Sequence, residues 1–129
     1  MKISIITVCR NAATTIAKTL QSILAQSYPD IEIIIIDGGS TDNTLEIIRL
    51  YQDKIAVVVS EQDHGIYDAM NKGIQKASGE VLFFLNADDI FVNEKVVEDF
   101  MRVLFQRKSL ILYGNAVVFN PDEKKESLK

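Results

Sequence analysis

Two adjacent carboxylates, Asp88 and Asp89, follow directly after an apolar run at residues 81–85. Neighbouring carboxylates repel each other unless positive charge lies close to them. A divalent cation supplies such charge, because hard cations bind oxygen ligands. The pair therefore predicts a metal site, with the amide of Asn86 beside it. The alternative is a polar loop in which one of the two aspartates only caps the next helix.

A further carboxylate, Asp37, ends the isoleucine-rich run 31–36 and is followed by Gly38 and Gly39. Glycines allow a backbone or a ligand to approach closely, so Asp37 could accept hydrogen bonds from a nucleobase or a ribose. It could equally accept them only from nearby backbone amides. Asp42 lies where a helix begins and is better explained as a cap and a partner of the helix dipole.

Neither glycine-rich phosphate signature, GxGxxG or GK[ST], is present in the sequence. The charge of a nucleotide diphosphate would instead be offset by a metal at Asp88 and Asp89, helped by a base such as Arg10 or Lys72. His64 is the only histidine. It could act as a general base, but its polar surroundings favour a partly exposed loop residue.

Apolar runs and helical stripes alternate along the chain, which indicates an α/β fold with a mostly parallel open sheet and helices on both faces. The isoleucine-rich and phenylalanine-rich runs are predicted to be strands buried on both faces. Strands are expected at 3–8, 31–36, 55–59 and 81–85, and helices at 11–27, 42–52, 66–77 and 93–104. Asn11 is predicted to cap the first helix. The third helix should bury Ile66, Met70, Ile74 and Ala77 and end at a left-handed Gly79.

The last part of the chain is predicted to be a hairpin of strands 110–113 and 116–119, turned at Gly114-Asn115. The charged tail from Asp122 is expected to fray. The predicted organisation is therefore one α/β domain over 1–120 and a tail over 121–129.

Polar clusters at 7–11, 37–42, 60–65 and 86–89 each follow a predicted strand. Parallel strands end at the same edge of a sheet, so the four clusters should lie close together. Ligands of open α/β sheets bind at this edge, where the strand order reverses. The clusters therefore predict one binding site.

The composition is that of an ordinary globular domain, with 129 residues, 47% hydrophobic, 25% charged and a net charge of -4. A mildly acidic chain is a poor candidate for binding nucleic acid. The single Cys9 allows no disulfide within the chain and favours the cytosol. The apolar run 3–8 is too short for a signal peptide, and no run has membrane-spanning length.

Three segments resemble those of family-2 glycosyltransferases, in the same order and spacing. Residues 37–44 resemble the family's DDGSTDGT-type segment, and 63–73 are similar to the DxGIYDAMNKG segment of a bacterial branch. Residues 77–80 with 85–89 resemble its ASGE…FLxADD stretch. The resemblance covers the chain from Lys2 to about Leu112.

This resemblance implies a GT-A fold, a nucleotide-diphosphate sugar donor, most often a UDP-sugar, and a Mn2+ or Mg2+ ion bridging the diphosphate to Asp88 and Asp89. By position, Asp37 would bind the uridine, and residues 7–10 would line the base and ribose. The nucleotide-binding residues that it implies are Thr7, Val8, Arg10, Asp37, Gly38, Asp63, Asn71, Lys72 and Asp88.

The chain departs from the family pattern at several positions. Gly38 stands where many members have a second aspartate that can bind the base, Asn86 where the metal-binding segment begins, and Met70 where many have arginine. The family's general base lies in an acceptor-binding half that would follow Lys129. We therefore expect this chain to be the donor-binding half, without an identified catalytic base.

Three functions remain open from the sequence. The first is an inverting glycosyltransferase that acts on a saccharide or lipid-linked acceptor in cell-surface polysaccharide or glycolipid synthesis, at the cytoplasmic face of a bacterial membrane. The second is a nucleotide-sugar-binding module without turnover. The third is a sugar nucleotidyltransferase, which would need a basic, glycine-rich loop that residues 10–13 do not provide. Apolar surface near 110–119 could also lead to a homo-oligomer.

Overall fold

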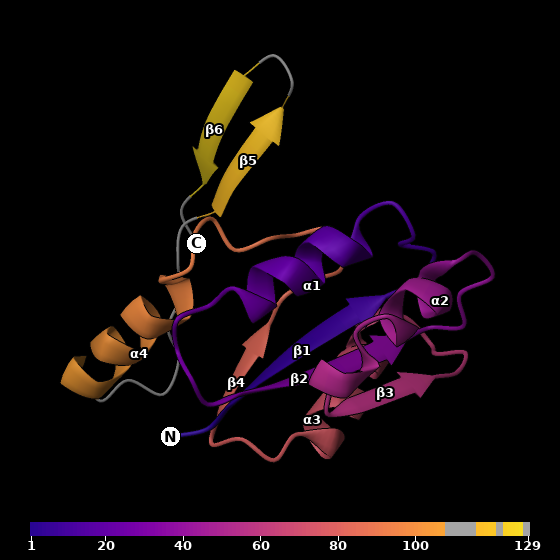
Figure 1. The fold of residues 1–129 in the computed structure, drawn as a ribbon, viewed down its shortest axis with the longest axis horizontal. Coiled ribbons are helices and arrows are strands. Elements are labelled where there is room, and N and C mark those ends of the chain that lie inside the picture. Colours follow the sequence, from indigo (N-terminus) through magenta and orange to yellow (C-terminus); the bar gives the residue numbers. More distant parts are fainter. Residues whose placement is uncertain (108–115, 121–122, 128–129) are drawn as a thin grey trace. The chain divides into compact units, whose positions relative to one another are not determined.

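The computed structural model describes residues 1–107, 116–120 and 123–127, and the chain divides into two compact units, Met1–Val97 and Glu98–Lys129. The first unit is a four-stranded parallel sheet with helices (Figure 1). Its strands are β1 (Ile3–Cys9), β2 (Ile31–Asp37), β3 (Val57–Ser60) and β4 (Val81–Phe84), and its helices are α1 (Ile16–Leu24), α2 (Thr44–Arg49), the 3-10 turn η1 (Gln52–Lys54) and α3 (Ile66–Lys76). The predicted α/β fold is confirmed.

The strand order is β3-β2-β1-β4, and every pairing is parallel. Ile3 of β1 pairs with Ile31 of β2 on one side and with Val81 of β4 on the other. The chain therefore builds the sheet outward from β1 in one direction and then returns to the opposite side of β1. The reversal of strand order lies between β1 and β4, which is where such sheets bind ligands.

The two central strands are buried on both faces, as the isoleucine-rich sequence predicts. Ile6, Ile34 and Ile36 pack with Ala69 of α3. Because side chains alternate along a strand, Ile5 and the residues beside it on β2 point to the opposite face. They are equally buried, and α1 contributes the buried residues Ile16, Leu20 and Ile23.

The same prediction is wrong for β4. Leu82 and Phe84 remain 38% and 39% exposed, while Val81 and Phe83 are half-buried. In the described sheet β4 is an edge strand, and α3 packs against β1 and β2 instead. An apolar sequence indicates burial without telling which strand is central.

The buried face of α3 also differs from its predicted stripe. Ala69 and Gly73 are buried, whereas Ile66 and Ile74 are 48% and 44% exposed. A Cβ atom at Gly73 would lie 2.3 Å from Cγ2 of Ile6. The small residues Ala69 and Gly73 thus let α3 pack closely against the sheet. A search for a stripe of large apolar residues does not predict this contact.

Gly79, expected in the left-handed conformation, is not among the glycines with positive φ in the part of the chain described. Glycine is needed at position 79 for a steric reason. A Cβ atom there would lie 2.6 Å from Oγ of Ser4 and 2.9 Å from the carbonyl oxygen of Lys2. The turn before β4 therefore needs glycine because it passes directly against the start of β1.

Asn11 does not cap α1, which begins after Thr15. Asn11 has a φ of 50°, and its Oδ1 accepts hydrogen bonds from the backbone N–H groups of Thr41 (2.8 Å) and Asp42 (3.3 Å). Asp42 in turn accepts from the N–H of Thr44, the first residue of α2 (3.0 Å), but the N-cap residue is Asn43, so Asp42 lies one residue before the cap position. The loops after β1 and β2 are thus joined to each other.

More hydrogen bonds cross between these two loops. The N–H of Asn11 donates to Oγ of Ser40, that of Ala12 to Oγ1 of Thr44, both at 2.8 Å, and that of Ala13 to Oδ2 of Asp42 at 3.2 Å. The loop between β1 and α1 is therefore held by the loop between β2 and α2 through both backbone and side-chain groups.

At the opposite end of the strands, Glu32 of β2 joins β1 to the end of α3. Its carboxylate accepts hydrogen bonds from Oγ of Ser4 (2.5 Å) and from the backbone N–H (2.7 Å) and Oγ (2.8 Å) of Ser78, and it pairs with Nζ of Lys2 at 3.4 Å. Burial alone would raise the pKa of Glu32, but these donors outweigh it and lower the pKa to about 2.

We expect Glu32→Gln to lower the free energy of unfolding by about 2 kcal/mol near neutral pH, because hydrogen bonds to a charged acceptor are lost or weakened. The pKa of Glu32 is lower in the folded chain than its usual 4.5. Its contribution is therefore complete above that value and disappears as the pH falls through about 2. Urea unfolding at a series of pH values checks this: the difference between wild type and variant should shrink in acid, and a constant difference would contradict it.

The second unit contains most of α4 (Val96–Arg107) and an antiparallel hairpin of β5 (Ala116–Asn120) and β6 (Glu123–Ser127). The strand predicted at 116–119 is confirmed, but its partner is β6, so the tail expected to fray forms a strand over 123–127. The predicted strand 110–113 and its turn lie outside the described residues, and the domain boundary near residue 120 stays a prediction. Among the described helices, none combines the length and apolar character needed to span a bilayer.

Candidate functional site

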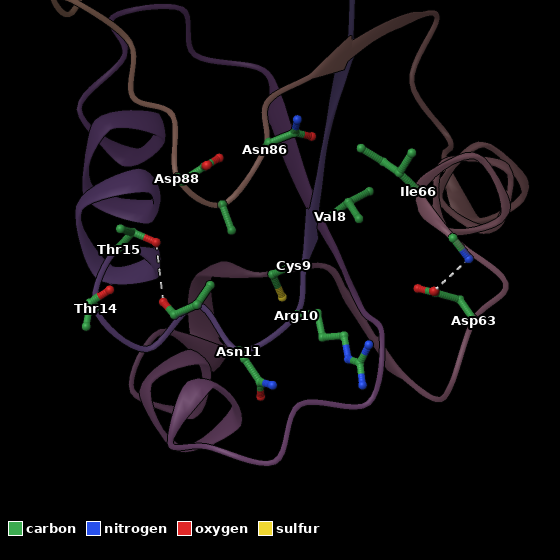
Figure 2. A pocket seen from close by; sticks show the side chains of 13 residues that line it. Val8, Cys9, Arg10, Asn11, Thr14, Thr15, Asp63, Ile66, Asn86 and Asp88 are labelled. Atoms are coloured by element: carbon green, nitrogen blue, oxygen red, sulfur yellow. Dashed lines mark hydrogen bonds between the residues drawn. The ribbon is translucent and has the colours of Figure 1, made fainter. Parts of the chain in front are cut away.

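A cleft of about 500 Å³ lies where β1 and β4 end and α3 begins. It occupies the reversal of strand order, and residues of the clusters 7–11, 60–65 and 86–89 line it, whereas none of the cluster 37–42 does. Figure 2 shows Asp88 and Asp63 on opposite sides of this cleft, with Val8 and Arg10 between them. The residues that line it are Val8, Cys9, Arg10, Asn11, Ala12, Thr14, Thr15, Asp63, Gly65, Ile66, Asn86, Ala87 and Asp88.

The turn that carries Asp88 is fixed from two sides. The N–H of Ala87 donates to the carbonyl of Val8 at 3.2 Å, and Oγ1 of Thr19 in α1 lies 2.7 Å from the carbonyl oxygens of both Ala87 and Asp89. These contacts hold the backbone while the side chain of Asp88 remains exposed in the cleft. Asp88 is therefore a positioned carboxylate that is open to a ligand.

The oxygen ligands that the cleft offers fit a divalent cation that binds together with a diphosphate. Asp88 lines the cleft with Asn86, whereas Asp89 is exposed but is not among the lining residues. Across the described ranges, no group of at least three His, Cys, Asp or Glu side chains could hold an ion. Mg2+ in nucleotide sites typically takes one or two carboxylates and completes its shell with phosphates and water. The metal roles of both Asp88 and Asp89 stay predictions.

Asp63 forms the opposite end of the cleft. Its Oδ1 accepts the backbone N–H of Gly65 at 3.1 Å, just before α3. Its Oδ2 lies 2.6 Å from the position that a Cβ atom on Gly38 would take. Gly38 does not line the cleft itself, but its missing side chain leaves the space for Asp63.

Asp37 lies just beneath the cleft and is fully buried. Its carboxylate accepts hydrogen bonds from the N–H of Gly39 (3.1 Å), the N–H and Oγ of Ser40 (2.9 and 2.5 Å), Oγ of Ser60 (2.8 Å) and the Cys9 thiol (3.4 Å). Burial opposes the charge, but these donors outweigh it and lower the pKa of Asp37. Burial and the nearby Asp37 carboxylate raise the pKa of Cys9. These contacts match the alternative in which Asp37 accepts hydrogen bonds from the protein, and its role in nucleotide binding stays a prediction.

The other predicted nucleotide-binding residues lie outside the cleft lining. Thr7 is fully buried, and its hydroxyl has no hydrogen-bond partner among the described residues. Lys72 pairs with Glu61 at 3.1 Å and with Asp68 at 3.5 Å, while Asn71 is exposed. His64 is exposed, and its backbone N–H donates to Oδ2 of Asp68. The binding roles of all the predicted nucleotide-binding residues, Thr7, Asn71 and Lys72 included, stay predictions.

The sequence profile of glycosyl transferase family 2 matches residues 4–129. The chain belongs to glycosyltransferase family 2. This membership confirms the resemblance of the three segments and leaves the sugar nucleotidyltransferase alternative without support. A relative of this family-2 chain is the PGL/p-HBAD biosynthesis glycosyltransferase of Mycobacterium bovis, 40% identical over 89 residues that cover 67% of this chain and 35% of the relative. The chain thus spans about a third of that relative's length.

Solved structures place this family-2 chain among GT-A glycosyltransferases. S. aureus TarS 1–349 in complex with UDP-GlcNAc superimposes with a TM-score of 0.76 at 28% identity, covering 84% of this chain and 32% of that TarS chain. The mannosyltransferase PcManGT from Pyrobaculum calidifontis, in complex with GDP-Man and Mn2+, has a TM-score of 0.75 at 25% identity, covering 80% and 32%. The expected GT-A fold is confirmed.

Several residues of the cleft in this family-2 chain were not predicted. They belong to the loop after β1 and the first turn of α3, namely Ala12, Thr14, Thr15 and Ile66. The polar residues among them follow the first strand directly, so the rule that placed 7–11 at the ligand edge would have included them if extended by one turn of chain. Ile66 had been assigned to the core instead.

Proposed function

We propose that this chain forms the donor-binding part of an inverting glycosyltransferase. The donor, a nucleotide-diphosphate sugar and in the first place a UDP-sugar, binds in the cleft at the ends of β1 and β4. The observation that carries the proposal is the open, positioned carboxylate of Asp88 at the reversal of strand order. The similarity to TarS in complex with UDP-GlcNAc supports a uridine donor.

In this proposal Asp88, with Asn86 beside it, holds a Mn2+ or Mg2+ ion, and Arg10 contributes positive charge from the loop after β1. The ion, when bound, neutralises charge on the diphosphate leaving group. The Mn2+ in the PcManGT complex supports a metal of this kind. The acceptor is a saccharide or a lipid-linked sugar in the synthesis of cell-surface polysaccharide at the cytoplasmic side of the membrane, and the catalytic base is not assigned.

Calorimetric titration of UDP with and without Mn2+ tests this proposal. We expect UDP to bind clearly more tightly with Mn2+ than without it, and Mn2+ alone to bind weakly, because the described residues supply too few ligands for the ion by themselves. The coupling must be reciprocal, so saturating UDP should tighten Mn2+ binding by the same factor. An affinity for UDP that is the same with and without Mn2+, or no UDP binding, would contradict the proposal.

A second candidate is a nucleotide-sugar-binding module without turnover. It is favoured by the lining of the cleft, in which Asp63 and Asp88 are the only carboxylates among the described residues, and Asp88 holds the metal in the proposal above. Incubation with UDP-sugars and Mn2+, followed by analysis for released UDP, separates the two. Donor binding without hydrolysis or transfer would favour the module.

A further inference from the structure

We propose that Asp63 recognises the base of the donor nucleotide, and that Gly38 is the residue that allows it to do so. The proposed ligand is a base whose ring N–H points to a carboxylate oxygen, in the first place uracil. This inference rests on the proposed function, because it requires a nucleotide in the cleft. The family resemblance placed Asp63 among the nucleotide-binding residues but gave the base to Asp37, and the inference differs from it on that point.

The carboxylate of Asp37 is already occupied by the protein. Its two oxygens share five donors from Gly39, Ser40, Ser60 and Cys9, and the residue has no exposed surface. A base could reach it only by displacing some of these donors, each of which would then lose its acceptor. Asp37 therefore fixes the loop after β2, and another group must read the base.

Asp63 has the properties that Asp37 lacks. It lines the cleft, and only its Oδ1 accepts a hydrogen bond from the described residues, the N–H of Gly65 at 3.1 Å. This bond orients the carboxylate and leaves Oδ2 available to a ligand. Figure 2 shows Asp63 on the far side of the cleft from Asp88, so a nucleotide could extend from the metal-binding end to Asp63.

Gly38 determines where Oδ2 of Asp63 lies. A Cβ atom at position 38 would be 2.6 Å from this oxygen and 3.2 Å from the carboxylate carbon, closer than two such atoms can approach. Any side chain at position 38 would therefore displace the carboxylate. Because position 38 has no side chain, the carboxylate of Asp63, from the loop after β3, occupies the space beside it.

A carboxylate distinguishes bases because it only accepts hydrogen bonds. The ring N3 of uracil carries a hydrogen and donates, whereas the ring N3 of cytosine has a lone pair and would face Asp63 unfavourably. Asparagine has nearly the same shape as aspartate but can present either an oxygen or an NH2 group, so it should tolerate both bases. Asp63 thus predicts selectivity for UDP over CDP.

The experiment measures the affinities of UDP and CDP in the presence of Mn2+ for the full chain and three variants. Asp63→Asn should reduce the ratio of UDP to CDP affinity by about tenfold or more, the value of a charge-assisted hydrogen bond. Gly38→Ala should reduce the ratio similarly by displacing Asp63. Asp53→Asn makes the same chemical change at an exposed site in η1 and should leave the ratio unchanged.

Using the ratio removes the general effect of charge, because loss of a negative side chain helps both nucleotides equally. Melting curves and circular dichroism establish that each variant is folded, and Asp63→Asn alone decides the matter if Gly38→Ala does not fold. A UDP:CDP ratio that Asp63→Asn leaves unchanged, or equal affinities in the wild type, would overturn this inference while the proposed function stands. No binding of either nucleotide would overturn both.

Discussion

Replacing Asp88 by asparagine is expected to remove the Mn2+ dependence of UDP binding and to weaken UDP binding in Mn2+ by about a hundredfold. The reason is that the cleft offers few oxygen ligands, so the loss of one carboxylate leaves the ion almost without a charged protein ligand. Loss of groups that merely orient a metal ligand already costs about ten- to a hundredfold. In the absence of Mn2+, the variant should bind UDP as well as the wild type does.

Asp89→Asn is the matched control for Asp88→Asn, because it makes the same change one residue later, outside the cleft lining. We expect a much smaller effect on the Mn2+ dependence. The turn should survive both changes, since its anchors are backbone carbonyls bound by Thr19. An equal loss in both variants would mean that the ion uses both carboxylates, and no loss in either would contradict the metal site.

Replacing Asp37 by alanine is expected to lower the free energy of unfolding by about 3 kcal/mol or more, the effect typical of breaking a buried, fully hydrogen-bonded charge. Five donors converge on this carboxylate, and alanine would leave the buried ones without an acceptor. Urea unfolding at neutral pH measures the loss, and Asp53→Ala, at an exposed position, should change stability little.

The pH dependence provides an independent check on Asp37. The pKa of its carboxyl is lower in the folded chain than the usual 3.8, so its stabilising contribution is present above that value and is lost as the pH falls through the lowered one. The stability of the wild type and Asp37→Ala should therefore converge in acid. If Asp37→Ala is as stable as the wild type at neutral pH but loses UDP binding, Asp37 contacts the nucleotide instead.

The sequence predicts the sheet well because its signals are local. Runs of isoleucine with polar residues at their ends identify the strands and the ligand edge, and Asp88 and Asp63 belong to segments that the family resemblance singles out. The burial of β4 and of α3 was misjudged because it depends on neighbours. Leu82 and Phe84 are apolar but lie at an edge, while Gly73 makes a close helix contact without any apolar side chain.

Hydrogen-bond competition is another feature that the sequence does not reveal. Asp37 ends a strand and Asp63 follows one. Both oxygens of Asp37 accept hydrogen bonds from the protein, whereas among the described residues only Oδ1 of Asp63 does. Asparagine is a residue type that often caps helices, but the side chain of Asn11 accepts hydrogen bonds from the loop after β2. Such choices depend on which donors the fold brings within reach.

The junction between the loops after β1 and β2 has a consequence for the thermodynamics of binding. Asn11 and Ala12 are tied to Ser40, Thr41 and Thr44, so this wall of the cleft is already immobilised before any ligand arrives. A nucleotide that binds there loses translational and rotational entropy, but no further entropy is lost in ordering this loop. Loosening the junction by Asn11→Ala should therefore appear in calorimetry as a less favourable binding entropy.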